Sequence, residues 1–363
     1  MAKVNGSLVF NILCWLGLVD YPNSSWVNRM KTSMAQFVFA AGYVDTIAIY
    51  LTCFDNLLMP KLLAMEQIIS IVSSAAVMVI MTRQRKQLTS LLANLSFLGP
   101  LDYKKVNIML LCLCILPFAY ASSMLICFIR AGKEDLLFLN HYILIENKAL
   151  KFSIYFYKLF MMYVVFPTLT NLVSLVYSIS CLICHKSLEK LCLEVEDCSP
   201  KELTTKKLVE FLQNRNRIIK VLKEIQSIFS TATFIICTAN FMACFSNFGQ
   251  VITYSPVYVE LAVCETVNVA FLALVSMMSI FYYAGLIPMD MQRFTDILRE
   301  HYEQRALLGI VPENSALERL VFEEKTFLLS GCDLIFYRKD TITTALGTIL
   351  NYGLLILSIE LKR

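Results

Sequence analysis

Charged side chains are scarce in this sequence of 363 residues. Asp, Glu, Lys and Arg make up 17% of it, whereas 57% of the residues are hydrophobic. A soluble globular domain carries about 25% charged residues, because its surface must be solvated. The mean hydropathy of +0.62 agrees with this composition. The sequence therefore excludes a soluble globular protein and predicts an integral membrane protein.

Histidine is rare as well, and the three present, His141, His185 and His301, lie outside the apolar runs. No nucleophile and base can be paired inside those runs, so neither an enzyme nor a cofactor is expected. Most of the 13 cysteines lie within apolar runs, where a thiol behaves as a small hydrophobe. Cys181 and Cys184, which precede His185, have C-x-x-C spacing, but no further ligands accompany them, so no metal site is predicted. Basic residues interleaved with aromatic ones are also missing, which argues against a nucleic-acid partner.

Long apolar runs are what the sequence does contain. A helix needs about 20 residues to cross a bilayer, and seven runs are long enough. They lie at 31–53, 62–82, 106–130, 152–184, 226–250, 261–287 and 341–360. The fourth is too long for one crossing, so its carboxyl end is expected to continue as a helix beyond the membrane. An eighth run, at 327–337, is too short to cross. The expected fold is all-α, with seven transmembrane helices.

The placement of Lys and Arg predicts the orientation of these spans. With the amino terminus inside, the inner loops hold 19 of these residues and the outer loops 5. Because positive charge favours the cytoplasmic side, the amino-terminal segment 1–30 is expected in the cytosol and the carboxyl terminus outside. No small-residue cleavage site follows the first apolar run, so a signal peptide is not predicted.

Two amphipathic stretches lie between the predicted spans. In 185–225 and again in 291–308, apolar residues recur at helical spacing among charges. We expect helices that project into the cytosol and pack against one another or against a neighbouring subunit. The alternative is that they lie on the lipid surface. The predicted division is a six-helix bundle at 31–287, a cytoplasmic anchor at 288–340, and a seventh helix with the carboxyl terminus at 341–363.

Ionisable residues within the predicted spans form a further group. They are Asp45, Glu66, Lys158 and Glu265. A charged side chain in lipid is costly, so each is expected to face the interior of the bundle.

The last span carries a polar stripe. Thr341, Thr344, Thr348, Asn351 and Ser358 fall on one face of a 3.6-residue helix. These groups either bond other helices or their own preceding carbonyls, or they line a water-filled path between several copies of the helix.

Thr344-Ala345, then LGTIL, then Asn351-Tyr352 has the spacing of a known signature. It resembles the end of the insect gustatory receptors and, more distantly, of the odorant receptors: Thr-Tyr, five mostly apolar residues, then Gln-Phe. Ala, Asn and Tyr replace three of the four named residues. The preceding GCDLIFYRKDTITTAL and the amino-terminal LGLVDYP are also similar to that family. The resemblance is close over about the last 35 residues.

The resemblance implies a non-selective cation channel of four subunits, opened by a small-molecule tastant. The tetramer would be homomeric or formed with other gustatory receptor subunits, in the plasma membrane of chemosensory neurons and in contact with lipid. The implied pore-lining residues are Thr344, Thr348, Asn351, Tyr352 and Leu355. The implied ligand-binding residues lie among the second to sixth helices: Tyr120, Tyr155, Tyr163, Asn247, Glu265 and Asn268.

Two other classes of protein also cross the membrane several times and are alternatives to the channel. A G-protein-coupled receptor would need the opposite orientation, and the third and seventh spans lack its Asp/Glu-Arg-Tyr and Asn-Pro-x-x-Tyr motifs. A secondary transporter should show an internal repeat with broken helices in corresponding positions, and the sequence shows none.

Overall fold

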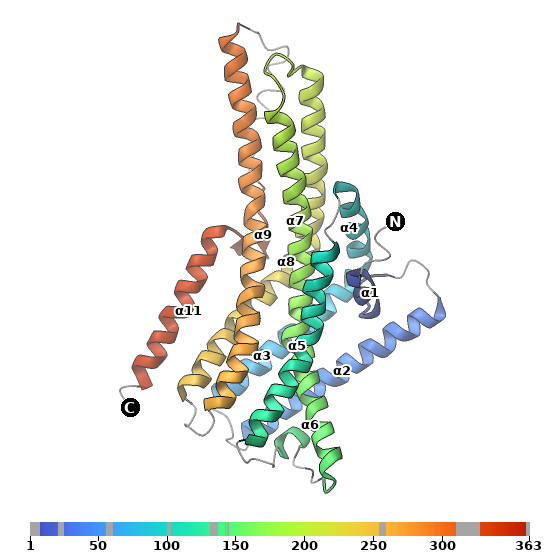
Figure 1. The fold of residues 1–363 in the computed structure, drawn as a ribbon, viewed down its shortest axis with the longest axis vertical. Helices are drawn as coiled ribbons and strands as arrows, with labels where there is room; N and C mark the ends of the chain where they lie inside the picture. Colours follow the sequence, from blue (N-terminus) through green and yellow to red (C-terminus); the bar gives the residue numbers. More distant parts are fainter. Residues whose placement is uncertain are drawn as a thin grey trace.

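The protein is a bundle of long helices, seen in a computed structural model (Figure 1). The structure describes residues 8–20, 25–55, 61–99, 103–130, 137–141, 143, 145–253, 259–309 and 327–360. The elements are α1 (Leu8–Trp15), α2 (Trp26–Asp55), α3 (Lys61–Arg83), α4 (Arg85–Leu98), α5 (Tyr103–Arg130), η1 (Leu137–Asn140), α6 (Lys148–Tyr163), η2 (Val164–Thr168), α7 (Leu169–Glu196), α8 (Thr205–Thr253), α9 (Val259–Leu307), β1 (Ser330–Gly331), β2 (Ile335–Phe336) and α11 (Lys339–Glu360).

Six helical segments among the described residues are long and apolar enough to cross a membrane. They are Trp26–Thr52, Ala64–Arg83, Lys104–Arg130, Lys148–Glu196, Thr205–Phe245 and Val263–Leu307. Each contains or overlaps one of the first six predicted spans. The seventh prediction coincides with α11, whose 22 residues extend about 33 Å, close to the thickness of a bilayer core. The predicted all-α, multi-pass membrane architecture is therefore confirmed.

The two longest helices extend far beyond a membrane. α8 and α9 have 49 residues each, or about 74 Å, more than twice a hydrocarbon core of about 30 Å. The amphipathic stretches at 205–225 and 291–307 are the ends of these helices, and they form a three-helix extension with the end of α7 (Figure 1). Leu222 and Leu298 are fully buried there. Packing between helices, and not the lipid surface, covers the apolar faces. α9 is continuous through residue 288, where an anchor region was expected to begin.

The fourth crossing is broken where α6 meets α7. Pro167 lacks an amide hydrogen, and Phe166 has the extended angles φ −152° and ψ 126°. Polar side chains satisfy the carbonyls that the break releases: Ser74 donates to Val165 O at 2.6 Å, and Asn171 donates to Pro167 O at 2.8 Å. A broken helix can therefore persist inside a membrane bundle, because its backbone remains hydrogen-bonded.

The run at 327–337, too short to cross, forms a hairpin that the sequence did not predict. β1 and β2 pair antiparallel, and Cys332 and Asp333 have positive φ in the turn between them. Gln226 of α8 holds the hairpin, because its amide donates to Ser330 O at 3.0 Å and accepts from Ser330 N at 3.0 Å. The hairpin thus fixes the chain against α8 directly before α11 begins.

α11 begins in close contact with α9. A Cβ at Gly285 of α9 would lie 2.8 Å from the backbone nitrogen of Lys339, so only glycine permits this approach. From there α11 continues along the edge of the bundle, packed on α8 and α9. Its other side is turned away from the remaining helices (Figure 1).

Candidate functional site

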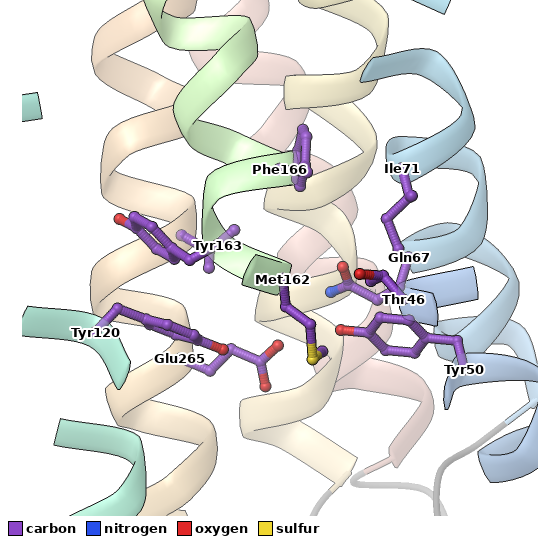
Figure 2. A pocket seen from close by; sticks show the side chains of 10 residues that line it. Thr46, Tyr50, Gln67, Ile71, Tyr120, Met162, Tyr163, Phe166 and Glu265 are labelled. Atoms are coloured by element: carbon purple, nitrogen blue, oxygen red, sulfur yellow. The ribbon is translucent and has the colours of Figure 1, made fainter. Parts of the chain in front are cut away.

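A small cavity lies between the spans, at the end of α9 opposite its extension. Figure 2 shows side chains from α2, α3, α5, α6, η2 and α9 converging on it. The lining residues are Thr46, Tyr50, Gln67, Ile71, Tyr120, Met162, Tyr163, Phe166, Glu265 and Val269. Its volume is about 20 Å³. That is enough for a water molecule, and well below the roughly 300 Å³ or more of a small-molecule pocket.

Two tyrosines form one wall of the cavity. The rings of Tyr120 and Tyr163 are stacked, with centroids 4.5 Å apart. Tyr163 also donates from its hydroxyl to the backbone oxygen of Asn268 at 3.0 Å, which joins α6 to α9. Both tyrosines are buried. The wall therefore offers an aromatic surface held in place from two sides.

Glu265 supplies the acidic group of the cavity. Its side chain is 9% exposed, and its carboxylate points into the cavity beside Tyr120 and Met162 (Figure 2). It makes no hydrogen bond or ion pair within the described part of the chain. A buried carboxyl without a partner is costly, so such a group inside a membrane bundle points to function.

Three of the six predicted ligand-binding residues, Tyr120, Tyr163 and Glu265, thus line one cavity. The other three do not. The backbone oxygen of Asn268 accepts the hydrogen bond from Tyr163, and its side-chain amide donates to Cys264 O at 2.7 Å. Asn247 is fully buried in α8, where it donates to Ala243 O at 2.7 Å. Tyr155 is buried on α6, away from the cavity lining.

The sequence did not identify the side of the cavity formed by α2 and α3. Thr46, Tyr50 and Gln67 come from these helices, and all three are buried. The signal available in the sequence was Asp45, an acidic residue in a span directly before Thr46. Asp45 predicted which face of α2 turns toward the bundle. It did not predict which other helices pack against that face.

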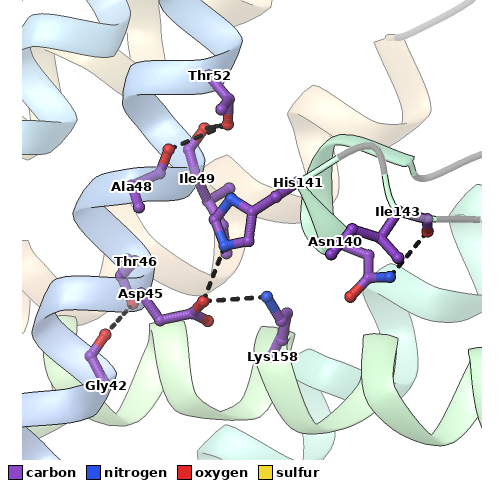
Figure 3. Close-up of polar contacts among 10 residues, drawn as sticks. All are labelled: Gly42, Asp45, Thr46, Ala48, Ile49, Thr52, Asn140, His141, Ile143 and Lys158. Carbon is purple, nitrogen blue, oxygen red and sulfur yellow. Dashed lines mark hydrogen bonds and ion pairs between the residues drawn. The ribbon is translucent and has the colours of Figure 1, made fainter.

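Asp45 forms an ion-paired cluster beside the cavity (Figure 3). Its Oδ1 lies 3.0 Å from Lys158 Nζ and 3.0 Å from His141 Nε2. These contacts join α2 to α6 and to the residue that follows η1. The prediction that Asp45 and Lys158 face the bundle is confirmed. Their pairing, and the part of His141, were not predicted.

The polar stripe of α11 is partly satisfied within its own helix. The hydroxyls of Thr344 and Thr348 donate to carbonyls four residues earlier, at 3.3 and 2.8 Å. Thr344 and Asn351 are exposed, whereas Ile349 on the other side is 4% exposed and packs into the bundle. Among the described helices of a single chain, therefore, none packs against this polar face of α11.

Tyr352 differs from its neighbours on this face. Its ring meets the ring of Phe245 of α8 edge-on, with centroids 5.5 Å apart, although 53% of the residue is exposed. Leu355 lies outside the residues whose side chains the structure describes.

Metal-ligating groups do not gather among the described residues. Cys181 and Cys184 are fully buried, and the 12 cysteines whose side chains the structure describes are free thiols. His185, which follows the C-x-x-C pair, bonds Asp290 of α9 through its Nδ1.

The fold and the cavity define a class: an all-α, multi-pass membrane protein with a small buried cavity among its spans. Solved structures share this fold. The insect olfactory receptor OR5 from Machilis hrabei is similar with a TM-score of 0.65 and 13% identity, over 99% of this chain and 97% of that one. The same receptor in complex with eugenol gives a TM-score of 0.65 and 12% identity, over 97% of each chain.

The chain thus has the fold of an insect olfactory receptor. Both matched structures are receptors, in line with the expectation that the chain is not an enzyme. No protein-family model and no curated protein sequence matches it. The identities of 12 and 13% concern the fold alone, and they do not separate the gustatory from the odorant branch.

Proposed function

We propose that this chain is a gustatory-receptor-like subunit of a non-selective cation channel, opened by a small molecule. Four subunits, from this chain alone or with related ones, would surround a pore in the plasma membrane. The amino terminus would lie in the cytosol and the carboxyl terminus outside. The support is the receptor fold, the cavity around Glu265 and the polar face of α11.

Glu265 is the observation that carries the proposal. An unpaired buried carboxyl beside stacked tyrosines suits a ligand that offers a hydrogen-bond donor or a positive charge next to an apolar body. In the proposed orientation the cavity lies in the outer half of the bundle. Such a ligand needs more room than about 20 Å³, so binding would favour a wider state of the bundle. Met162 lines the cavity, and its flexible side chain is suited to making that room.

The pore would form where four copies of α11 meet. Thr344, Thr348 and Asn351 would then turn to a common water-filled path. Hydroxyls that already donate to their own backbone still offer oxygen lone pairs to a passing cation. Tyr352, with its ring against Phe245, would link the pore wall to α8.

Neither alternative gains support from the described structure. A secondary transporter would need matched broken helices, but the break at Pro167 has no counterpart at Pro117 or Pro288, which lie inside unbroken α5 and α9. A G-protein-coupled receptor would need the reverse orientation, with the three-helix extension outside the cell.

Whole-cell recording tests the proposal. Cells expressing the chain would be exposed to sugars, bitter compounds, amines and cuticular lipids. A ligand that evokes current would then be used to compare the variants. Glu265→Gln should raise the half-maximal ligand concentration about tenfold or more, because a charge-assisted contact is lost. The matched control is Glu300→Gln, on the exposed end of the same helix.

The pore is tested separately in the same cells. Asn351→Ala should change the relative permeability of cations while leaving the half-maximal ligand concentration near that of the wild type. A ligand response that runs wholly through G-protein signalling, without a current of its own, would overturn the channel assignment.

A further inference from the structure

A second and larger hollow lies between α5, α7 and α9, away from the cavity around Glu265. Its volume is about 560 Å³. We call it the α5–α7–α9 groove. α5 contributes Lys105, Val106, Ile108, Met109, Cys112, Leu113 and Leu116; α7 contributes Asn171, Ser174, Leu175, Ser178, Ile179, Leu182, Ile183 and Lys186; α9 contributes Leu272, Val275, Ser276, Ser279 and Tyr283. The proposed function makes no use of it.

The walls of the groove are apolar and open to the surroundings of the bundle. Ile108, Met109 and Val275 are each about half exposed, at 53, 51 and 46%. In a membrane-spanning bundle, side chains with this exposure meet lipid or another protein. The groove is therefore accessible from the membrane and not from water alone.

Serines form the floor of the groove, and most of their hydroxyls are paired. Ser178 donates to Ser279 Oγ at 3.2 Å, and Ser279 donates to Ser276 O at 2.8 Å. Ser174 lies 3.3 Å from the same carbonyl. The Ser276 hydroxyl is buried without a partner among the described residues, but the other three are paired, so an apolar chain can lie over them at little cost in lost hydrogen bonds.

Two lysines mark one end of the groove. Lys105 is near the start of α5, and Lys186 is on α7 toward the three-helix extension; both are exposed. The ammonium group of Lys186 makes no hydrogen bond or ion pair within the described part of the chain. The groove thus combines an apolar body with positive charge at one end only.

The length of the groove matches one leaflet of a membrane. Fifteen residues separate Asn171 from Lys186, which is about 22 Å along α7. A bilayer is about 40–45 Å thick with its headgroups, so one leaflet is about 20–22 Å. Lys186 then lies at headgroup level, and Asn171 near the middle of the bilayer.

We propose that the α5–α7–α9 groove binds one anionic phospholipid of the cytoplasmic leaflet. Its phosphate lies against Lys105 and Lys186, and an acyl chain follows the groove over the serine floor. Anionic lipids are concentrated in that leaflet, and basic pockets between transmembrane helices on that side suit their headgroups. The choice of leaflet depends on the orientation given under the proposed function.

Native mass spectrometry of the purified full-length protein tests this. The protein would be offered equal amounts of phosphatidylserine and phosphatidylcholine, and the lipids retained would be counted. We expect the wild type to prefer phosphatidylserine about tenfold, and the K105Q/K186Q variant to lose that preference. The matched control is K104Q/K190Q: Lys190 pairs with Glu194, and neither control residue lines the groove.

A second variant tests the apolar part of the groove. Val275→Trp fills it with an indole ring and should reduce retention of both lipids. Equal retention of the two lipids by the wild type, or no effect of K105Q/K186Q, would overturn the proposal. It would also be overturned if Val275→Trp dissociated an oligomer without changing the lipid count, because the groove would then be an interface between copies.

Lipid retention requires neither a tastant nor an open pore, so the two proposals fail separately. A chain that retains phosphatidylserine through both lysines, but whose ligand response runs wholly through G-protein signalling, would contradict the channel and support the lipid site. Labelling of Lys186 by a membrane-impermeant amine reagent added outside intact cells would contradict the cytoplasmic leaflet.

Discussion

The hydroxyl of Tyr337 donates a hydrogen bond to Thr233 Oγ1 at 2.8 Å, and this bond joins the segment before α11 to the middle of α8. The Tyr337 ring is 1% exposed and packs against Tyr177 of α7 and Phe281 of α9. One side chain therefore contacts all three long helices. α9 also carries Glu265, so one continuous helix connects the cavity to the contact between Phe281 and Tyr337 before α11.

Tyr337→Phe removes this hydrogen bond and keeps the ring. We expect the free energy of unfolding to fall by about 1 kcal/mol, the usual net value of one hydrogen bond. Thermal unfolding of the purified protein measures it. The control is Tyr157→Phe on α6, a tyrosine that is 56% exposed. If the two variants melt at the same temperature, the buried bond contributes nothing to stability.

Gly331→Ala should destabilise the hairpin through a clash. An added Cβ would lie 2.3 Å from Tyr337 Oη and 3.1 Å from Phe234 Cβ. Relieving such contacts in a packed interior costs about 1–3 kcal/mol. Gly347→Ala in α11 is the matched control, because its Cβ would meet nothing within 4 Å. That control should leave the melting temperature unchanged or raise it, and a similar loss in both variants would contradict the clash.

Gln226→Met should release the hairpin from α8. The variant keeps the length of the side chain and loses three contacts with Ser330, at 2.7, 3.0 and 3.0 Å. We expect faster amide hydrogen exchange at 327–337, because the Ser330 amide loses its partner on α8. Gln304→Met, on the exposed end of α9, is the control and should leave that exchange unchanged. Unaltered exchange in Gln226→Met would mean that the hairpin holds without its contact to α8.

The sequence predicted the spans because length and hydropathy alone determine which runs can cross a membrane. It also placed Asp45 and Lys158 inside the bundle, since lipid excludes charge. It could not predict the hairpin. Its turn has three residues, Cys332, Asp333 and Leu334, and none of them is the glycine that such turns favour. The hairpin is held by Gln226, which lies 104 residues before Ser330 in the chain.

The cavity was predicted on one side only. The resemblance to the gustatory receptors implied Tyr120, Tyr163 and Glu265 as ligand-binding residues. Nothing in the sequence pointed to Thr46 or Gln67, because periodicity identifies the inward face of a helix but not the helix that it meets. That information comes from the packing of α2 against α6 and of α3 against η2, which depends on contacts between distant residues.

The Asp45 cluster gives the last prediction. Asp45→Asn removes the charge that faces Lys158 and His141, each 3.0 Å away. The Lys158 side chain is only 12% exposed, so it would be left as a poorly solvated charge. Breaking a fully buried pair costs about 3–5 kcal/mol. The Asp45 side chain is 37% exposed, so water screens the pair and we expect a smaller loss, about 1–2 kcal/mol.

Removing both charges should recover much of that loss. In D45N/K158M no charge is left without a partner, and methionine keeps most of the volume of lysine in the gap between α2 and α6. The double variant is therefore expected to melt closer to the wild type than D45N does, with a coupling energy of about 1 kcal/mol in the double-mutant cycle. Additive losses in the two single variants would show that Asp45 and Lys158 lie close together without stabilising each other. In that case His141 alone would be the partner through which Asp45 holds α2 in place beside the cavity.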